Sequence, residues 1–162
     1  MQKNKNISSS LFLFLTSFIF CTNILGVNLE EHRHGLNVYK KGNYMGCHSW
    51  HCKGGGHGAA VSLRNTELTL NEIINVIKCG RPGTGMPYFL RKAYKAEKCY
   101  DITFEDYDGS NRPVNSQNFL SSKQIEAVSV FVKEVFQDKE LDKTYCEFFY
   151  KKGSKICLNL KN

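Results

Sequence analysis

The sequence predicts an all-α domain with long loops. Two segments begin with a complete helix-capping signal and continue with apolar residues at helical spacing. The alternation of apolar and polar residues that is typical of a strand is scarce. The chain has 162 residues, enough for one domain with a sizeable core. It shows no internal repeat, so residues 27–162 are interpreted as a single domain.

Three helices are expected, in chain order. The first has the weakest signal and covers Leu36 to Tyr44. The second follows the capping box Thr69-Leu70-Asn71-Glu72, in which the acid stands three residues after the N-cap, and it ends at Gly80. The third follows a second capping box at Ser121 to Gln124 and carries an apolar stripe as far as Val135.

Residues 1–26 are predicted to be a secretory signal peptide. Lys3 and Lys5 form a basic start, and the apolar run from Leu11 to Phe20 is too short to favour a membrane span. No pair of small residues marks a cleavage site before Val27, so an uncleaved N-terminal anchor is the alternative. We therefore expect a periplasmic protein that contacts a membrane only if this segment is retained.

The composition is basic, with 22 Lys and Arg residues against 15 Asp and Glu, a net charge of +7. Loss of Lys3 and Lys5 with the signal segment removes two of these charges and leaves +5. Solubility explains any single lysine, whereas the excess as a whole favours docking to an acidic partner. The sequence has no basic stripe interleaved with aromatic residues, so nucleic acid is not an expected partner.

Six cysteines follow the signal segment, and export would permit disulfide bonds between them. Sequence alone does not fix the pairing. The preferred pairs are the two short loops, Cys79–Cys99 and Cys146–Cys157. The first bond would hold the segment around Met86 from both sides, and the second would hold the C-terminal segment in place. Cys47 and Cys52 remain, and Cys52 has no obvious role.

Two short motifs indicate haem chemistry. Cys47 is followed at once by His48; in c-type haem proteins such a thiol binds a vinyl group and the neighbouring imidazole ligates the iron. The sequence Gly85-Met86-Pro87 places a methionine in a loop, where it has little local core to fill, and a thioether can be the opposite axial ligand. The usual motif has another cysteine three residues before Cys47, where this chain has Tyr44.

Several segments follow one another in the order of one known family. They are an attachment-helix end at 42–51, a glycine-rich loop at 54–58, a counterpart of Gly-Pro-x-Leu at 60–63, a methionine loop at 80–87 and a C-terminal helix at 120–132. Together they resemble the class I c-type cytochromes. The methionine loop is the most specific match, and it is similar to that of cytochromes serving periplasmic quinoprotein alcohol dehydrogenases.

The resemblance implies a class I cytochrome c-like helical domain wrapped around one haem c. His48 and Met86 would be the axial ligands and Cys47 the single thioether, with a haem held only by the two ligands as the alternative. Trp50, Arg64 and Arg81 lie near the motifs in sequence and have donors that could bind the haem propionates. The resemblance also implies that Leu63 and Tyr88 form the pocket wall. It further implies that the Val61 carbonyl accepts the second ring N–H of His48.

A protein of this kind carries single electrons between a periplasmic dehydrogenase and a terminal oxidase or another cytochrome. It would not be an enzyme, because both axial positions are filled. One alternative is a haem enzyme or sensor in which Met86 is displaced. Another is a haem-free interaction domain stabilised by disulfides or zinc, with ligands drawn from the Cys and His residues at 47–57. In a second haem frame, Trp50 takes the second cysteine position and His51 ligates the iron.

Overall fold

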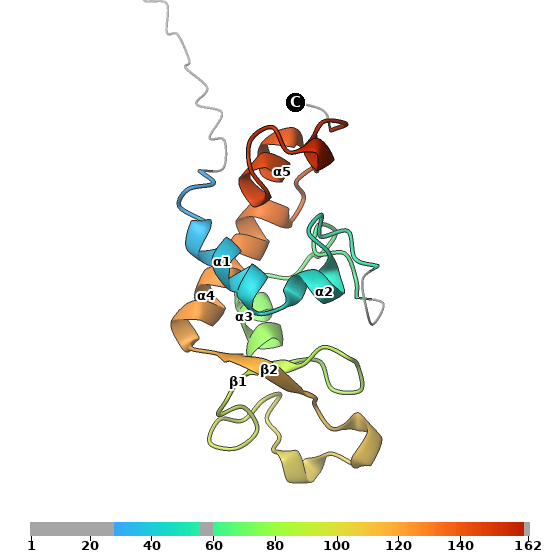
Figure 1. Ribbon diagram of the computed structural model, residues 1–162. Helices are drawn as coiled ribbons and strands as arrows, with labels where there is room; N and C mark the ends of the chain where they lie inside the picture. The colour runs from blue at the N-terminus through green and yellow to red at the C-terminus, as the bar shows by residue number, and fades with distance from the viewer. Residues whose placement is uncertain (1–27, 56–59, 161–162) are drawn as a thin grey trace, which may run out of the picture.

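The computed structural model describes residues 28–55 and 60–160; the predicted signal segment and His57 lie outside them. Helices dominate the described chain, in the order α1 (Arg33–Lys41), α2 (Tyr44–His48), α3 (Leu70–Cys79), α4 (Ser122–Phe131) and α5 (Lys143–Phe149). One π-helical turn, η3 (Val132–Phe136), continues α4. Figure 1 shows α5 at one end of the molecule and the segment between the two strands at the other. No helix in this part of the chain is long and apolar enough to cross a bilayer.

The prediction of an all-α, cytochrome c-like helical domain is wrong, because the fold also contains a parallel sheet. The strands β1 (Tyr88–Leu90) and β2 (Asn115–Leu120) pair with Tyr88 opposite Asn115 and Leu90 opposite Leu120, and the register is irregular between these points. All three residues of β1 are buried, and β2 alternates poorly, so neither strand has the period-two pattern of a half-buried strand. Their pairing is also non-local, and local periodicity cannot reveal it.

The two capping boxes mark the starts of α3 and α4, as predicted. The Thr69 hydroxyl accepts from the Glu72 N–H at 3.3 Å, and the Glu72 carboxylate accepts from the Thr69 N–H at 2.7 Å. Ser121 and Gln124 form the same reciprocal pair. The helix expected over residues 36–44 is divided instead, because Asn43 adopts a left-handed φ of 59° between α1 and α2.

Helix α1 crosses closely over α4 at Gly35. A Cβ at Gly35 would lie 2.5 Å from the Ala127 carbonyl oxygen and from the Phe131 Cβ, so only glycine permits this distance between the helices. The ring of Tyr39, one turn further along α1, packs edge-on against Phe131 and Phe136. This crossing anchors the chain immediately before α2.

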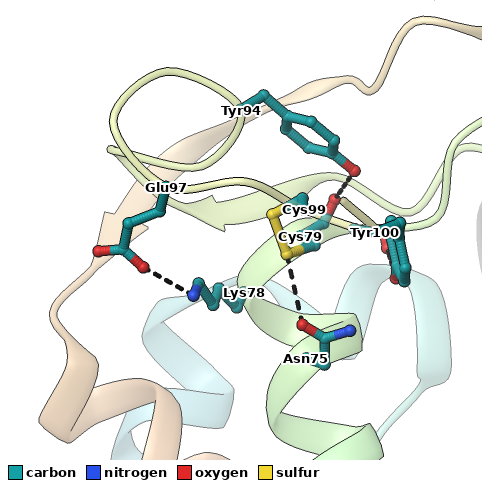
Figure 2. Close-up of a disulfide and its surroundings, with 8 residues drawn as sticks. Asn75, Lys78, Cys79, Tyr94, Glu97, Cys99 and Tyr100 are labelled. Atoms are coloured by element: carbon teal, nitrogen blue, oxygen red, sulfur yellow. Dashed lines mark hydrogen bonds and ion pairs between the residues drawn. A yellow bond between two sulfur atoms is a disulfide. The ribbon is translucent and has the colours of Figure 1, made fainter. Parts of the chain in front are cut away.

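Both predicted disulfides are confirmed. Cys79, the last residue of α3, is bonded to Cys99, and Cys146 in α5 is bonded to Cys157. Cys47 and Cys52 are free thiols. Figure 2 shows the Cys79–Cys99 bond together with Tyr94, Glu97 and Tyr100 from the segment that follows β1.

Candidate cofactor-binding site

An apolar cavity lies among α2, the segment 60–68, α3 and the loop 81–86, with Val132 of η3 completing its wall. The space between its walls is about 1010 Å³, part of which is open to solvent. The α3 contribution is Ile73, Val76 and Ile77, from the apolar stripe that follows the Thr69 capping box. Arg81 is the only Lys, Arg, Asp or Glu side chain among its described wall residues.

The cavity brings together six of the nine site residues predicted from sequence. These six are Cys47, His48, Val61, Leu63, Arg81 and Met86. Trp50, Arg64 and Tyr88 do not contribute to the wall. The residues proposed for the thioether and for both axial ligands therefore face one cavity, although Met86 lies 38 residues after His48 in the sequence.

Helix α2 presents Cys47 and His48 to this cavity. It is only five residues long, and a left-handed residue stands at each end, Asn43 with φ 59° and Ser49 with φ 63°. Cys47 is partly exposed with a free thiol, whereas the His48 side chain is buried. The short helix thus places a reachable thiol beside a sheltered imidazole.

The His48 ring is oriented by one backbone contact. Its Nδ1 lies 3.0 Å from the Val61 carbonyl oxygen, which can only accept, so Nδ1 carries the proton and Nε2 keeps its lone pair. Burial lowers the pKa of His48, and the nearby Arg81 charge adds to this, while the Val61 bond opposes it. A neutral imidazole with one nitrogen occupied in this way is the form that ligates metals.

The contact from Val61 is the one that the family resemblance implied, and it depends on the backbone alone. The Val61 side chain is 60% exposed, so most of it is turned to solvent. The hydrogen bond therefore needs the Val61 carbonyl and not the Val61 side chain.

His51 does not reach the cavity wall. Its Nδ1 accepts from the Lys53 N–H at 3.1 Å, and its ring packs edge-on against Trp50. The reason is local: the left-handed Ser49 redirects the chain just after α2. Of the two haem frames considered from sequence, only the one with His48 has its imidazole in the cavity.

The loop that carries Met86 is closed by its own hydrogen bonds. The Arg81 N–H donates to the Met86 carbonyl at 3.1 Å. The Thr84 hydroxyl donates to the Arg81 carbonyl at 2.7 Å and accepts from the Met86 N–H at 3.2 Å. Gly80 precedes the loop with φ 68°, and a Cβ there would meet the Tyr88 backbone nitrogen at 2.7 Å. Met86 is thus held in a compact turn rather than an open loop.

Tyr44, at the position of the missing cysteine, forms an aromatic part of the wall. Its ring is stacked between Tyr39 at 5.4 Å and Phe89 at 4.7 Å, and only 4% of the residue is exposed. Its hydroxyl has no hydrogen-bond partner among the described residues, and burial raises its pKa. Sequence reasoning treated this residue only as a missing thiol and did not anticipate the stack.

Arg64 is a buried framework residue. Its guanidinium donates to the carbonyls of His51 at 2.7 Å, Lys139 at 2.8 Å and Glu140 at 3.3 Å, and it lies over the Tyr145 ring. These contacts tie the segment after α2 to the segment after η3.

Trp50 and Tyr88 also have other partners. Trp50 stacks on Tyr145 and packs edge-on against Tyr150. The Tyr88 hydroxyl donates to the Asn115 side chain within the sheet. Trp50 and Tyr88 therefore stabilise elements that surround the cavity, and they are not part of its wall.

Cys52 is fully buried, and sequence reasoning gave it no role. Its sulfur lies 3.3 Å from the Tyr39 hydroxyl and 3.8 Å from the Tyr145 hydroxyl. Burial raises the pKa of its thiol to about 11, so the protonated form prevails at neutral pH. The residue joins α1 and α5 to the segment that follows α2.

The zinc alternative has no grouped ligands in the described chain. Within residues 28–55 and 60–160, no three His, Cys, Asp or Glu side chains lie close enough to hold a metal ion. His57 was among the residues considered for that site, and it lies outside these ranges.

Comparisons with protein-family models, with curated proteins and with solved structures found no match to this chain.

Proposed function

We propose that the cavity binds one haem and that the protein transfers single electrons. One observation carries the proposal: Cys47, His48 and Met86 line the same cavity, and the Val61 carbonyl orients the His48 ring. A soft thioether and a neutral imidazole are the pair of protein ligands expected for an electron-carrying haem iron.

The remaining walls are compatible with such a group. Leucine, isoleucine and valine side chains from the 60–68 segment and α3 provide the apolar surface that a porphyrin requires. Arg81 would supply a cation for a carboxylate at the edge of the ring. Tyr44, whose ring is stacked between Tyr39 and Phe89, would add an aromatic residue to this wall.

Cys47 would attach the group covalently through a single bond. Its thiol sulfur would add to one vinyl carbon, and the thiol proton would pass to the other, with no change in oxidation state. Tyr44 has no thiol to offer, so a second attachment at that position is excluded by residue type.

The residues of the cavity would then do three things. His48 would hold the iron through Nε2, since Nδ1 is engaged with Val61. Met86 would be the second protein ligand of the iron, and its thioether would favour the reduced state and so raise the reduction potential. The apolar wall would limit access of water. When bound, haem supplies an iron that accepts and releases one electron.

The expected partners follow from this chemistry and from the charge of the chain. A basic electron carrier is steered toward acidic surfaces, and the net charge of +5 expected after loss of residues 1–26 favours such encounters. We assign the donor to a periplasmic dehydrogenase and the acceptor to an oxidase or another cytochrome. A protein with both ligand positions filled by its own side chains acts as a carrier and not as an enzyme.

Replacement of Met86 tests this function. Met86→Ala should keep the haem, because Cys47 and His48 remain. It should lower the midpoint potential and open the iron to carbon monoxide, because the soft sixth ligand is lost. Potentiometry and carbon monoxide titration of the haem-loaded full chain measure both effects.

Met45→Ala is the matched control. Met45 is a partly buried methionine in α2 that does not line the cavity, so its loss should leave the potential and carbon monoxide affinity near those of the wild type. If wild-type protein binds carbon monoxide as readily as Met86→Ala and their potentials agree, Met86 is not a ligand. The site would then be an open one, as in a haem enzyme or sensor.

A further inference from the structure

The segment between β1 and β2 folds back onto the end of α3. Three of its residues each make a contact within Lys78–Gly80. The Cys99 sulfur is bonded to Cys79 and the Glu97 carboxylate pairs with Lys78 at 2.6 Å, while the hydroxyl of Tyr94 donates to the Cys79 carbonyl at 2.7 Å (Figure 2).

A fourth contact reaches Gly80 itself. The Tyr100 hydroxyl donates to the Gly80 carbonyl at 2.7 Å. The last carbonyls of a helix have no partner within the helix, and most are left to water or to a cap. Here two tyrosine hydroxyls from one neighbouring segment satisfy two successive carbonyls where α3 ends.

Both tyrosines adopt an unusual backbone conformation. Tyr94 has φ 63° and Tyr100 has φ 55°, in the left-handed region that bulky residues avoid. Such conformations persist only where the surrounding contacts over-determine them. Tyr94 is also enclosed by the rings of Tyr88, Phe104 and Tyr107. Both hydroxyls nevertheless reach carbonyls at the end of α3.

The contact from Tyr100 continues directly to Met86 through one peptide group. The Gly80 carbonyl that accepts from Tyr100 belongs to the same planar unit as the Arg81 N–H, and that N–H donates to the Met86 carbonyl at 3.1 Å. Because a peptide group is rigid, a bond that fixes its oxygen also fixes the direction of its N–H. Gly80, with φ 68°, lies close against the backbone of Met86, Pro87 and Tyr88, so a shift of this unit is felt directly by the Met86 turn.

We infer that Tyr100 is a positioning residue for Met86. Its hydroxyl holds the Gly80–Arg81 peptide group, which in turn holds the Met86 turn against the cavity, and the Cys79–Cys99 bond keeps Tyr100 in place. This role rests on the proposed function, because only a haem bound in the cavity would give Met86 an iron to ligate. Without the hydroxyl, Met86 leaves the iron more often, and the iron becomes more reactive toward added ligands.

Tyr100→Phe removes only the hydroxyl and tests the role. In the haem-loaded full chain, we expect carbon monoxide to bind roughly fivefold faster and the midpoint potential to fall, the scale being that of one lost hydrogen bond. Haem content should not change. Tyr150→Phe is the control, because it makes the same chemical change in a tyrosine next to Trp50, outside the cavity wall.

A second variant and a second readout keep the outcomes distinct. Tyr94→Phe frees the Cys79 carbonyl, one peptide further from Met86, and should have a smaller effect on carbon monoxide binding. Hydrogen exchange of the Arg81 amide should accelerate in Tyr100→Phe even in haem-free protein. Faster exchange with unchanged potential and carbon monoxide binding would overturn the inference, as would unchanged exchange. A wild type that takes up no haem would refute the proposed function and, with it, the role given to Tyr100.

Discussion

The two ring nitrogens of His48 have separate tasks in this account. Nδ1 is occupied by the Val61 carbonyl, and Nε2 would be left to hold the iron of the proposed haem. The two nearby cysteines also differ in their surroundings. Cys47 is partly exposed beside the cavity, whereas Cys52 is buried next to the hydroxyls of Tyr39 and Tyr145. The two free thiols of the described chain therefore differ in access to solvent.

This difference predicts selective thiol chemistry. In haem-free native protein, iodoacetamide should label Cys47 well before Cys52, because Cys52 is fully buried and its pKa is raised to about 11. Denaturant should make the two rates similar. Peptide mapping of the labelled sites measures each cysteine separately.

Cys47→Ser serves as the control for this experiment, since it should abolish rapid labelling in the described part of the chain. Equal rates at the two cysteines in native protein would contradict the burial assigned to Cys52.

Sequence was informative at this scale where a residue's chemistry is tied to a motif. Cys47, His48 and Met86 were predicted from residue type and setting, and the cavity brings them together. Nearness in sequence was a poorer guide. Trp50 was placed near the propionates because it follows the Cys-His pair, but the left-handed Ser49 between them turns the chain away.

At the scale of elements, α3 and α4 begin at residues with clear local signals, whereas α2 has no side-chain cap. The Thr69 and Ser121 capping boxes start α3 and α4, and Gly80 ends α3. These signals were readable because capping depends on residues three positions apart. The strands carry no comparable signal, since their pairing joins Tyr88 to Asn115, which are distant in the chain.

The crossing of α1 and α4 gives a prediction at this scale. Gly35→Ala should destabilise the fold by about 1–3 kcal/mol, because its Cβ would lie 2.5 Å from Ala127 and Phe131 and the helices must separate. Chemical denaturation measures the change in the free energy of unfolding.

Gly109→Ala provides the matched control, because a Cβ there has nothing within 4 Å and should alter stability little. Equal stability of Gly35→Ala and wild type would show that the helices do not approach as closely as described.

At the scale of the whole molecule, two segments outside the cavity wall are each held by a disulfide bond, and each supports one side of the cavity. The segment between the strands is joined by Cys79–Cys99 and holds the Met86 side. The C-terminal part is joined by Cys146–Cys157, and Tyr145 of α5 stacks on Trp50, two residues after the end of α2. Both pairings were predicted from loop length. The way in which these two segments pack was not predicted, because it depends on contacts between residues that are distant in the chain.

The central claim, that His48 holds a haem in this cavity, is tested most directly by comparing His48→Ala with His51→Ala. The full chain would be expressed in a host that exports proteins and attaches c-type haem, and haem content and absorption spectra would be measured. Wild type and His51→Ala should each carry about one haem per chain, with a low-spin spectrum that shows reducible α and β bands, because His51 lies outside the cavity. His48→Ala should lose that spectrum. A wild type without a Soret band, or a spectrum lost in His51→Ala and kept in His48→Ala, would contradict the account.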